Sequence, residues 1–236
     1  MRKALSFLNL IFTTIFLSIV ALVISPFDSR GEVIHRIERL WASIHLKIGG
    51  ISVSLEGLEG ITKPPYIFMC NHQSALDIFA LLSALPLSFK WIAKRELFFI
   101  PFFGWAIKRA GHISLDRKNP REALKAIDEA ARKIKGGINI IIFPEGTRSK
   151  DGSLLPFKKG GFSLALRARV PIVPVGIWGT SRLQPKGSFI PKEKGIIYIR
   201  IGEPMHIEEE SRSAKTKIML EVRRHIERLM AYKEIK

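Results

Sequence analysis

Five short apolar runs, each bounded by a glycine, a proline or a charged residue, constrain the fold of this chain more than any other feature. They fall at residues 66–70, 111–115, 138–143, 172–177 and 196–201, and their β-branched content is typical of strands. Helical stretches separate them. The clearest is residues 119–136, with Asn119 as the N-cap, Pro120 in the first turn and Gly136 as the stop. An apolar stripe at residues 218–229 predicts a last helix. Strands that alternate with helices predict an α/β fold with a mostly parallel sheet flanked by helices, whose chemistry belongs in loops at the carboxyl ends of the strands.

The N-terminal segment has a different character. Ala4 to Ser25 form a charge-free stretch of 22 residues, and about 20 are needed to cross a bilayer core as a helix. After the potential cap Asp28, apolar positions recur at helical spacing, with His35 on another face, which predicts an amphipathic helix for the headgroup layer. We therefore expect two domains: membrane-anchoring helices at residues 1–48 and an α/β catalytic domain at residues 49–236. Both a spanning anchor and insertion into one leaflet remain open.

The charge of the chain indicates an anionic partner. Its 38 Lys and Arg against 21 Asp and Glu give +17; the first 60 residues hold six basic and five acidic residues, a net +1, which leaves +16 for the rest. An anionic lipid surface and nucleic acid both fit such a charge. Nucleic acid is the weaker alternative, because the basic residues are dispersed and the aromatic residues cluster in one apolar run.

Cysteine and histidine are used sparingly. The single cysteine, Cys70, excludes an internal disulfide and is interpreted as a small buried apolar residue. His112 is read as a strand residue, and no Cys or His cluster has the spacing of metal ligands, so no metal site is predicted.

The stretch "NHQSALD" offers an acid/base pair. His72 and Asp77 would point apart on one regular helix, because five residues at roughly 100° each separate them around the axis. They can meet if His72 lies in the loop after a strand and the helix begins at Ser74, a start that a capping box from Ser74 to Asp77 supports. Asp77 would then hold one ring nitrogen and leave the other to accept a proton from a hydroxyl. A simple helix cap beside a loop histidine explains this motif equally well.

Two further strand-end loops suit an anion. In "FPEGTRS", the loop of Gly146, Thr147 and Arg148 combines backbone N–H groups, a hydroxyl and a guanidinium, which suit an oxyanion or phosphate. Glu145 fits a phosphate site less well, and a polyol hydroxyl or a neighbouring arginine is its more natural partner. In "GHISLDR", Arg117 could bring a second guanidinium to the same anion, with a strand-ending salt bridge as the alternative.

An aromatic run at residues 97–111 predicts either an acyl-chain groove or a membrane contact, with ordinary core packing as the alternative. The nearby cations Lys90, Lys94 and Arg95 favour a position close to lipid phosphates. The large side chains of this run are Phe98, Phe99, Phe102, Phe103 and Trp105.

Four stretches in order, "NHQSALD", "GHISLDR", "FPEGTRS" and "VPIVPV", together resemble the glycerolipid acyltransferase family and its HX4D motif. The resemblance covers roughly residues 60–205, and "NHQS" and "FPEGTRS" resemble the lysophosphatidate-using branch. It implies that His72, oriented by Asp77, acts as general base on the sn-2 hydroxyl of 1-acyl-sn-glycerol 3-phosphate. That hydroxyl would attack an acyl-carrier-protein or coenzyme A thioester and give phosphatidate.

The resemblance also implies the substrate contacts. Pro171 and Val173 would shape the acyl side, and the thioester would be a co-substrate rather than a bound cofactor. Glycerol 3-phosphate or another lysolipid is the alternative acceptor. The implied partners are membrane lipids and the acyl carrier protein or acyl-coenzyme A, without nucleic acid or metal, at the inner membrane with the catalytic domain on the cytoplasmic face. The residues implied to hold the glycerol phosphate are Arg117, Glu145, Gly146, Thr147 and Arg148.

Overall fold

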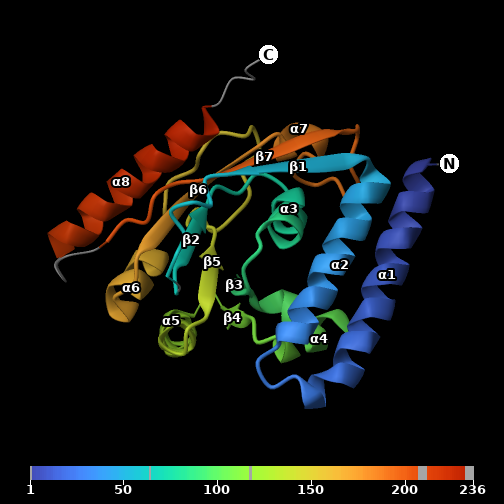
Figure 1. Ribbon diagram of the computed structural model, residues 1–236, viewed down its shortest axis with the longest axis horizontal. Coiled ribbons are helices and arrows are strands. Elements are labelled where there is room, and N and C mark those ends of the chain that lie inside the picture. Colours follow the sequence, from blue (N-terminus) through green and yellow to red (C-terminus); the bar gives the residue numbers. More distant parts are fainter. Residues whose placement is uncertain (1, 64, 117–118, 207–211, 232–236) are drawn as a thin grey trace.

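A seven-stranded sheet organises the chain (Figure 1), and the computed structural model describes residues 2–63, 65–116, 119–206 and 212–231. The strand order is β1-β7-β6-β2-β5-β3-β4, and every neighbouring pair is parallel except β6 with β7. The prediction of a mostly parallel α/β sheet flanked by helices is therefore confirmed. The strands are β1 (Ile51–Glu56), β2 (Ile67–Cys70), β3 (Phe89–Lys94), β4 (Ile113–Leu115), β5 (Asn139–Ile142), β6 (Ile172–Trp178) and β7 (Gly195–Ile201).

All five predicted strands form, and two further strands, β1 and β3, were not predicted from the sequence. β1 alternates apolar and polar residues at the edge of the sheet, and β3 carries Lys90 in its interior. The interpretation of Lys90 as a lipid-phosphate contact was wrong: its side chain is buried, and its Nζ donates to the Gly31 carbonyl over 3.0 Å. Burial lowers the pKa of Lys90, which is consistent with that dry position.

Helices cover both faces of the sheet (Figure 1). One face carries α2 (Glu32–Gly49) and α3 (Leu76–Ala84), with α1 (Arg2–Ile24) and α4 (Phe103–Arg109) packed outside them. The other carries α5 (Pro120–Lys135), α6 (Lys159–Ala168) and α8 (Arg212–Met230), and α7 (Thr180–Leu183) is a short turn after β6. The short 3-10 helices η1 (Ser25–Phe27) and η2 (Arg95–Phe99) complete the elements. Each face buries its own apolar cluster, so the sheet is dry on both sides, as parallel sheets are.

The predicted helix signals around α5 and α8 are confirmed. The Asn119 side chain accepts the N–H groups of Arg121 and Glu122 at 3.0 and 3.3 Å, and Gly136 ends α5. Ile218 and Val222 of α8 are buried in the core, where the sequence stripe places them. Cys70 is also fully buried, as expected.

α1 lies against α2 and α4 and leaves much of its surface uncovered (Figure 1). Two polar contacts join α1 to α2: Thr13 Oγ1 lies 3.0 Å from His45 Nε2, and Trp41 Nε1 donates to Thr14 Oγ1 at 2.9 Å. Among the described residues, one helical stretch, Ser6–Phe27, is long and apolar enough to cross a membrane. The exposed face of α1 includes Leu8, Phe12, Phe16 and Val23.

A buried polar cluster fastens α2 to the sheet. Glu38 of α2 accepts from His112 Nε2 at 2.7 Å, and His35 Nδ1 lies 3.3 Å from its other oxygen. His112 Nδ1 accepts the Trp91 N–H at 3.0 Å, which fixes the tautomer that donates to Glu38. The sequence places His35 on another face than the apolar stripe, and that face is buried as well, because α2 packs against α3 and the sheet. Burial alone would raise the pKa of Glu38, but His112 and His35 outweigh burial and lower it.

Candidate active site

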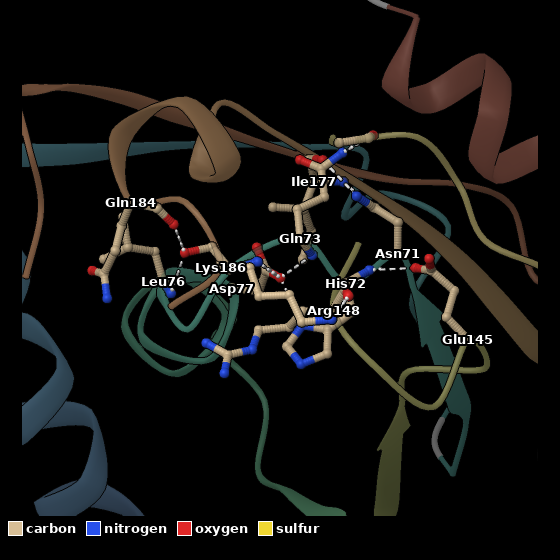
Figure 2. Close-up of polar contacts among 12 residues, drawn as sticks. Asn71, His72, Gln73, Leu76, Asp77, Glu145, Arg148, Ile177, Gln184 and Lys186 are labelled. Carbon is tan, nitrogen blue, oxygen red and sulfur yellow. Dashed lines mark hydrogen bonds and ion pairs between the residues drawn. The ribbon is translucent and has the colours of Figure 1, made fainter. Parts of the chain in front are cut away.

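The loops that follow β2 and β5 meet at one edge of the sheet, because these strands are parallel neighbours. Two hydrogen bonds to the His72 backbone join the loops. The Ser149 N–H donates to the His72 carbonyl at 2.8 Å, and the His72 N–H donates to the side-chain Oε1 of Glu145 at 2.6 Å (Figure 2). The "NHQSALD" and "FPEGTRS" stretches therefore form one surface.

His72 and Asp77 form a hydrogen-bonded pair at this edge. His72 Nδ1 lies 2.8 Å from Asp77 Oδ2. The same oxygen accepts the N–H groups of Gln73 and Ser74, and Asp77 is fully buried. An acceptor oxygen at Nδ1 places the ring proton there, so Nε2 carries the lone pair. The imidazole lines the cavity described below, with 15 % of its side chain exposed.

The helix that carries Asp77 begins two residues later than predicted. α3 starts at Leu76, not Ser74, and Asp77 lies in its first turn. The Ser74 hydroxyl donates to the Gln184 carbonyl at 2.6 Å and accepts the Leu76 N–H at 3.2 Å. The acidic half of the capping box is present, because the Asp77 carboxylate accepts the Ser74 N–H. One carboxylate thus orients both the helix start and the histidine.

Aromatic rings fix the plane of the imidazole. The His72 ring stacks on Phe143, with ring centroids 3.9 Å apart and an interplanar angle of 15°. Trp91 stacks in turn near Phe143 at 5.7 Å and 13°. The ring is therefore held by packing as well as by Asp77.

Glu145 does not occupy the role predicted for it. Its side chain is only 2 % exposed, and its carboxylate points into the protein, where Oε1 accepts the His72 N–H and Oε2 accepts the Leu155 N–H at 2.8 Å. Glu145 is also missing from the side chains that line the adjacent cavity. Burial raises the pKa of Glu145 to about 7. Glu145 therefore clamps the two loops together instead of facing a substrate phosphate.

A cavity of about 800 Å³ opens beside His72. Its apolar walls come from α1, α2, α3 and α4, including Leu17, Phe79 and Ile107. Toward the loops the lining becomes polar and basic. The lining groups of this basic end are Lys94, Gly146, Thr147, Arg148 and Lys158. A histidine with a free lone pair thus borders a cavity that is lined by apolar side chains and by cations.

Lys158 is a site residue that sequence reasoning missed. Its chain crosses over Gly146, whose φ is +71°, and its Cδ and Cε lie 3.0 Å from where a Cβ at that glycine would sit. A side chain at position 146 would therefore displace a cation from the cavity wall. The signal available in the sequence was the position of Lys158 just before α6, in the segment that returns to the "FPEGTRS" loop.

The aromatic run divides between two environments. Phe103 lines the cavity, whereas Phe99 (66 % exposed), Phe102 and Trp105 (52 % exposed) lie on the surface near α1. Phe98 is half-buried and does not line the cavity.

The predicted acyl contact at Val173 is wrong, and the one at Pro171 stays a prediction. Val173 is fully buried in the sheet, since β6 is an interior strand between β7 and β2, and Pro171 precedes that strand. Neither residue lines the cavity. Arg117 lies outside the described residues. In the part of the chain that the structure describes, no three His, Cys, Asp or Glu side chains gather as metal ligands would.

The fold and the site define an α/β protein with a histidine–carboxylate pair between an apolar cavity and a basic loop. The acyltransferase family model matches residues 52–178, and the chain belongs to this family. The sequence is 38% identical over 198 residues to a chloroplastic 1-acyl-sn-glycerol-3-phosphate acyltransferase of Arabidopsis thaliana, covering 81% of this chain and 55% of the relative. It is 37% identical over 165 residues to the enzyme of that name from Pseudomonas aeruginosa, covering 69% and 63%. The chain spans between half and two thirds of the length of these relatives.

A solved structure agrees over the whole chain. The crystal structure of the 1-acyl-sn-glycerophosphate acyltransferase from Thermotoga maritima aligns with a TM-score of 0.80 at 32% identity, and the match covers 99% of this chain and 100% of that one. The likeness therefore includes the N-terminal helices as well as the sheet.

Proposed function

We propose that the protein transfers an acyl group from an acyl-carrier-protein or coenzyme A thioester to the sn-2 hydroxyl of 1-acyl-sn-glycerol 3-phosphate, giving phosphatidate. The observation that carries this proposal is the 2.8 Å contact between His72 Nδ1 and Asp77 Oδ2, which leaves Nε2 as a proton acceptor at the cavity. The names of the relatives support the acceptor.

The chemistry follows from that lone pair. His72 Nε2 takes the proton of the acceptor hydroxyl while its oxygen attacks the thioester carbonyl carbon. Asp77 stabilises the imidazolium that forms. When the tetrahedral intermediate collapses, the C–S bond breaks and the imidazolium returns its proton to the departing thiolate. No covalent acyl-enzyme is needed, because the acceptor and donor are held side by side.

The basic end of the cavity suits the acceptor phosphate. Arg148 and Lys158 line it, together with Thr147 and Gly146. Arg148 makes no ion pair with a carboxylate among the described residues, so its guanidinium is available to an oxyanion. We retain Arg117 as a further phosphate contact, which stays a prediction.

Replacing Arg148 with methionine should raise KM for lysophosphatidate roughly 10- to 100-fold, since a charge-assisted hydrogen bond contributes about 1.5–3 kcal/mol. Steady-state kinetics would show it, with kcat much less affected. The exposed Arg224 of α8 supplies the matched control, Arg224→Met. A similar loss on 1-acylglycerol, which lacks the phosphate, would argue against a phosphate contact.

The Asp77→Asn variant separates orientation from charge. All three hydrogen bonds to this side chain fall on Oδ2, whereas Oδ1 has no described partner. An asparagine can present its oxygen at the Oδ2 position and keep the ring oriented, so only the charge opposite the imidazolium is lost. We expect kcat to fall about 10- to 100-fold, equal to about 1.4–2.7 kcal/mol of transition-state stabilisation. Asp77→Ala should lose clearly more, and equal losses in both variants would contradict this division.

The Glu145→Gln variant tests the clamp between the two loops. An amide can accept only one of the two backbone N–H groups and turns a donor toward the other, which costs about 1–3 kcal/mol. We expect roughly a 5- to 100-fold lower kcat, with Glu129→Gln on α5 as a control. Because burial raises the pKa of Glu145 to about 7, the folded protein binds this proton more tightly than the unfolded chain does, and the stability from that difference is lost as the pH rises through 7. The free energy of unfolding of the wild type should therefore fall relative to that of Glu145→Gln as the pH rises from about 4.5 through 7, and a difference that stays constant over this range would contradict the raised pKa.

The apolar part of the cavity suits an acyl chain, and the exposed face of α1 with Phe99 and Trp105 suits a bilayer. We place the protein at the inner membrane with the catalytic domain on the cytoplasmic face, and residues 1–48 as the anchoring part. Protease accessibility in oriented vesicles would check this orientation.

A panel of acceptors and donors tests the proposed function as a whole. The purified protein is incubated with lysophosphatidate, glycerol 3-phosphate or lyso-phosphatidylglycerol and with acyl-carrier-protein or coenzyme A thioesters, and products are read by mass spectrometry. Phosphatidate from lysophosphatidate is the expected main product. A preference for another acceptor would make the protein an acyltransferase with a different substrate. The absence of any acyl transfer would refute the proposal.

A further inference from the structure

The segment Gln184–Phe189, called the brace loop here, touches both catalytic loops from outside. The Gln184 carbonyl accepts the buried Ser74 hydroxyl at 2.6 Å and so holds the loop that carries His72. Lys186 Nζ donates to the Arg148 carbonyl at 2.6 Å (Figure 2). It also lies 3.4 Å from Thr147 Oγ1. One short segment therefore fixes the backbone on both sides of the candidate acceptor site.

The brace loop has its own internal support. The Gln184 side-chain amide donates to the Ser188 carbonyl at 2.9 Å, and the Ser188 N–H donates to the Pro185 carbonyl at 3.0 Å. Gly187 supplies the turn with φ +95°. Because these hydrogen bonds tie the loop together, we expect a movement of its tip to shift Gln184 and Lys186 with it.

The tip of the brace loop is apolar and faces outward beside α1. Phe189 is 75 % exposed, and its ring lies edge-on to Phe7 of α1, with centroids 6.2 Å apart. Phe7 belongs to the exposed apolar face of α1, so Phe189 extends that face. Lys186 and Lys192 flank it as exposed cations, which complements anionic headgroups.

We infer that the brace loop is a lipid-contacting element that couples membrane binding to acceptor binding: Phe189 enters the bilayer beside α1, and this contact holds Lys186 and Gln184 against the two catalytic loops. The occupant is a lipid surface, because the exposed phenylalanine continues the apolar face of a membrane-seeking helix and carries cations at its rim. The inference rests on the proposed function only for the identity of the acceptor.

A fluorescence experiment tests the lipid contact without any turnover. The full chain with Phe189→Trp is reconstituted into vesicles of phosphatidylglycerol and phosphatidylethanolamine with or without brominated acyl chains. The indole at position 189 should add fluorescence to that of the native tryptophans, and brominated acyl chains should quench this added fluorescence. Leu220→Trp places an indole at an exposed apolar position of α8, and brominated chains should not quench the fluorescence that this indole adds. Equal quenching in the two variants would overturn the lipid contact.

Equilibrium binding of lysophosphatidate, measured without an acyl donor, tests the coupling. Phe189→Ser should raise Kd at least about fivefold in vesicles and much less in detergent micelles, since allosteric coupling is typically 5-fold or more. Lys186→Met should raise Kd in both, with Lys186→Arg recovering most of the affinity. Leu220→Ser and Lys217→Met on α8 serve as controls.

The outcomes separate this inference from the proposed function. Unchanged Kd values in Phe189→Ser and Lys186→Met, in a wild type that forms phosphatidate, would overturn the inference alone. Normal coupling in a protein that transfers no acyl group would leave the inference standing and refute the proposed function.

Discussion

Replacing His72 with alanine is expected to lower kcat for phosphatidate formation by roughly 10²- to 10⁴-fold, the usual contribution of a positioned general base. In the proposed mechanism the imidazole carries the lone pair that accepts the hydroxyl proton, and no other described histidine or carboxylate that lines the cavity shares its loop. The measurement is a phosphatidate time course from lysophosphatidate and an acyl thioester.

Folding and binding controls make this loss interpretable. His206→Ala, at an exposed position, should retain normal turnover. Among the described residues, the His72 side chain stacks on Phe143 and makes its one hydrogen bond with Asp77, so His72→Ala should still fold and bind vesicles. Near-normal turnover in His72→Ala would refute the base assignment and with it the mechanism.

Replacing Glu38 with alanine should cost about 3 kcal/mol of stability, the lower end of the range for breaking a buried pair. The change leaves the His112 ring without its acceptor and loosens the attachment of α2 to the sheet. For a chain of this size, 3 kcal/mol corresponds to roughly 6–12 °C in Tm, measurable in detergent. Glu129→Ala on the exposed face of α5 is the control, and a Tm as high as the wild-type value would show that the cluster is not stabilising.

The pH dependence of that stability has a definite sign. The folded-state pKa of Glu38 is depressed, so its contribution is present above the unfolded pKa of about 4.3 and is lost as the pH falls further. The Tm difference between wild type and Glu38→Ala should therefore be full at neutral pH and shrink below about pH 4. A difference that grows on acidification would contradict the depressed pKa.

The sequence predicted the elements that carry a clear period or a cap. Asn119 and the stripe at Ile218 and Val222 each mark a helix by local chemistry, and the five apolar runs became strands. β3 was missed because Lys90 reads as a surface residue. The Gly31 carbonyl and the carboxylates of Glu38, Glu32 and Asp28, all distant in sequence, make its burial tolerable.

The site residues likewise divide into those that local sequence predicts and those that depend on distant contacts. His72 and Asp77 are close in sequence, so capping chemistry and chain geometry were enough to predict that they could meet. The clamp by Glu145, the basic wall at Lys158 and the support from Lys186 depend on contacts between loops far apart in the chain. Residue types in "FPEGTRS" predicted an anion-binding loop but could not show that its carboxylate turns inward.

The pairing of β1 with β7 has a consequence for synthesis of the chain. Ile51 lies opposite Gly195, so the edge strand waits for its partner while the ribosome adds the intervening residues, roughly 7–30 s at 5–20 residues per second. α1 has left the ribosome long before that moment and can meet the bilayer while the sheet is still open. During that interval the unpaired edge of β1 is a template on which another chain can pair.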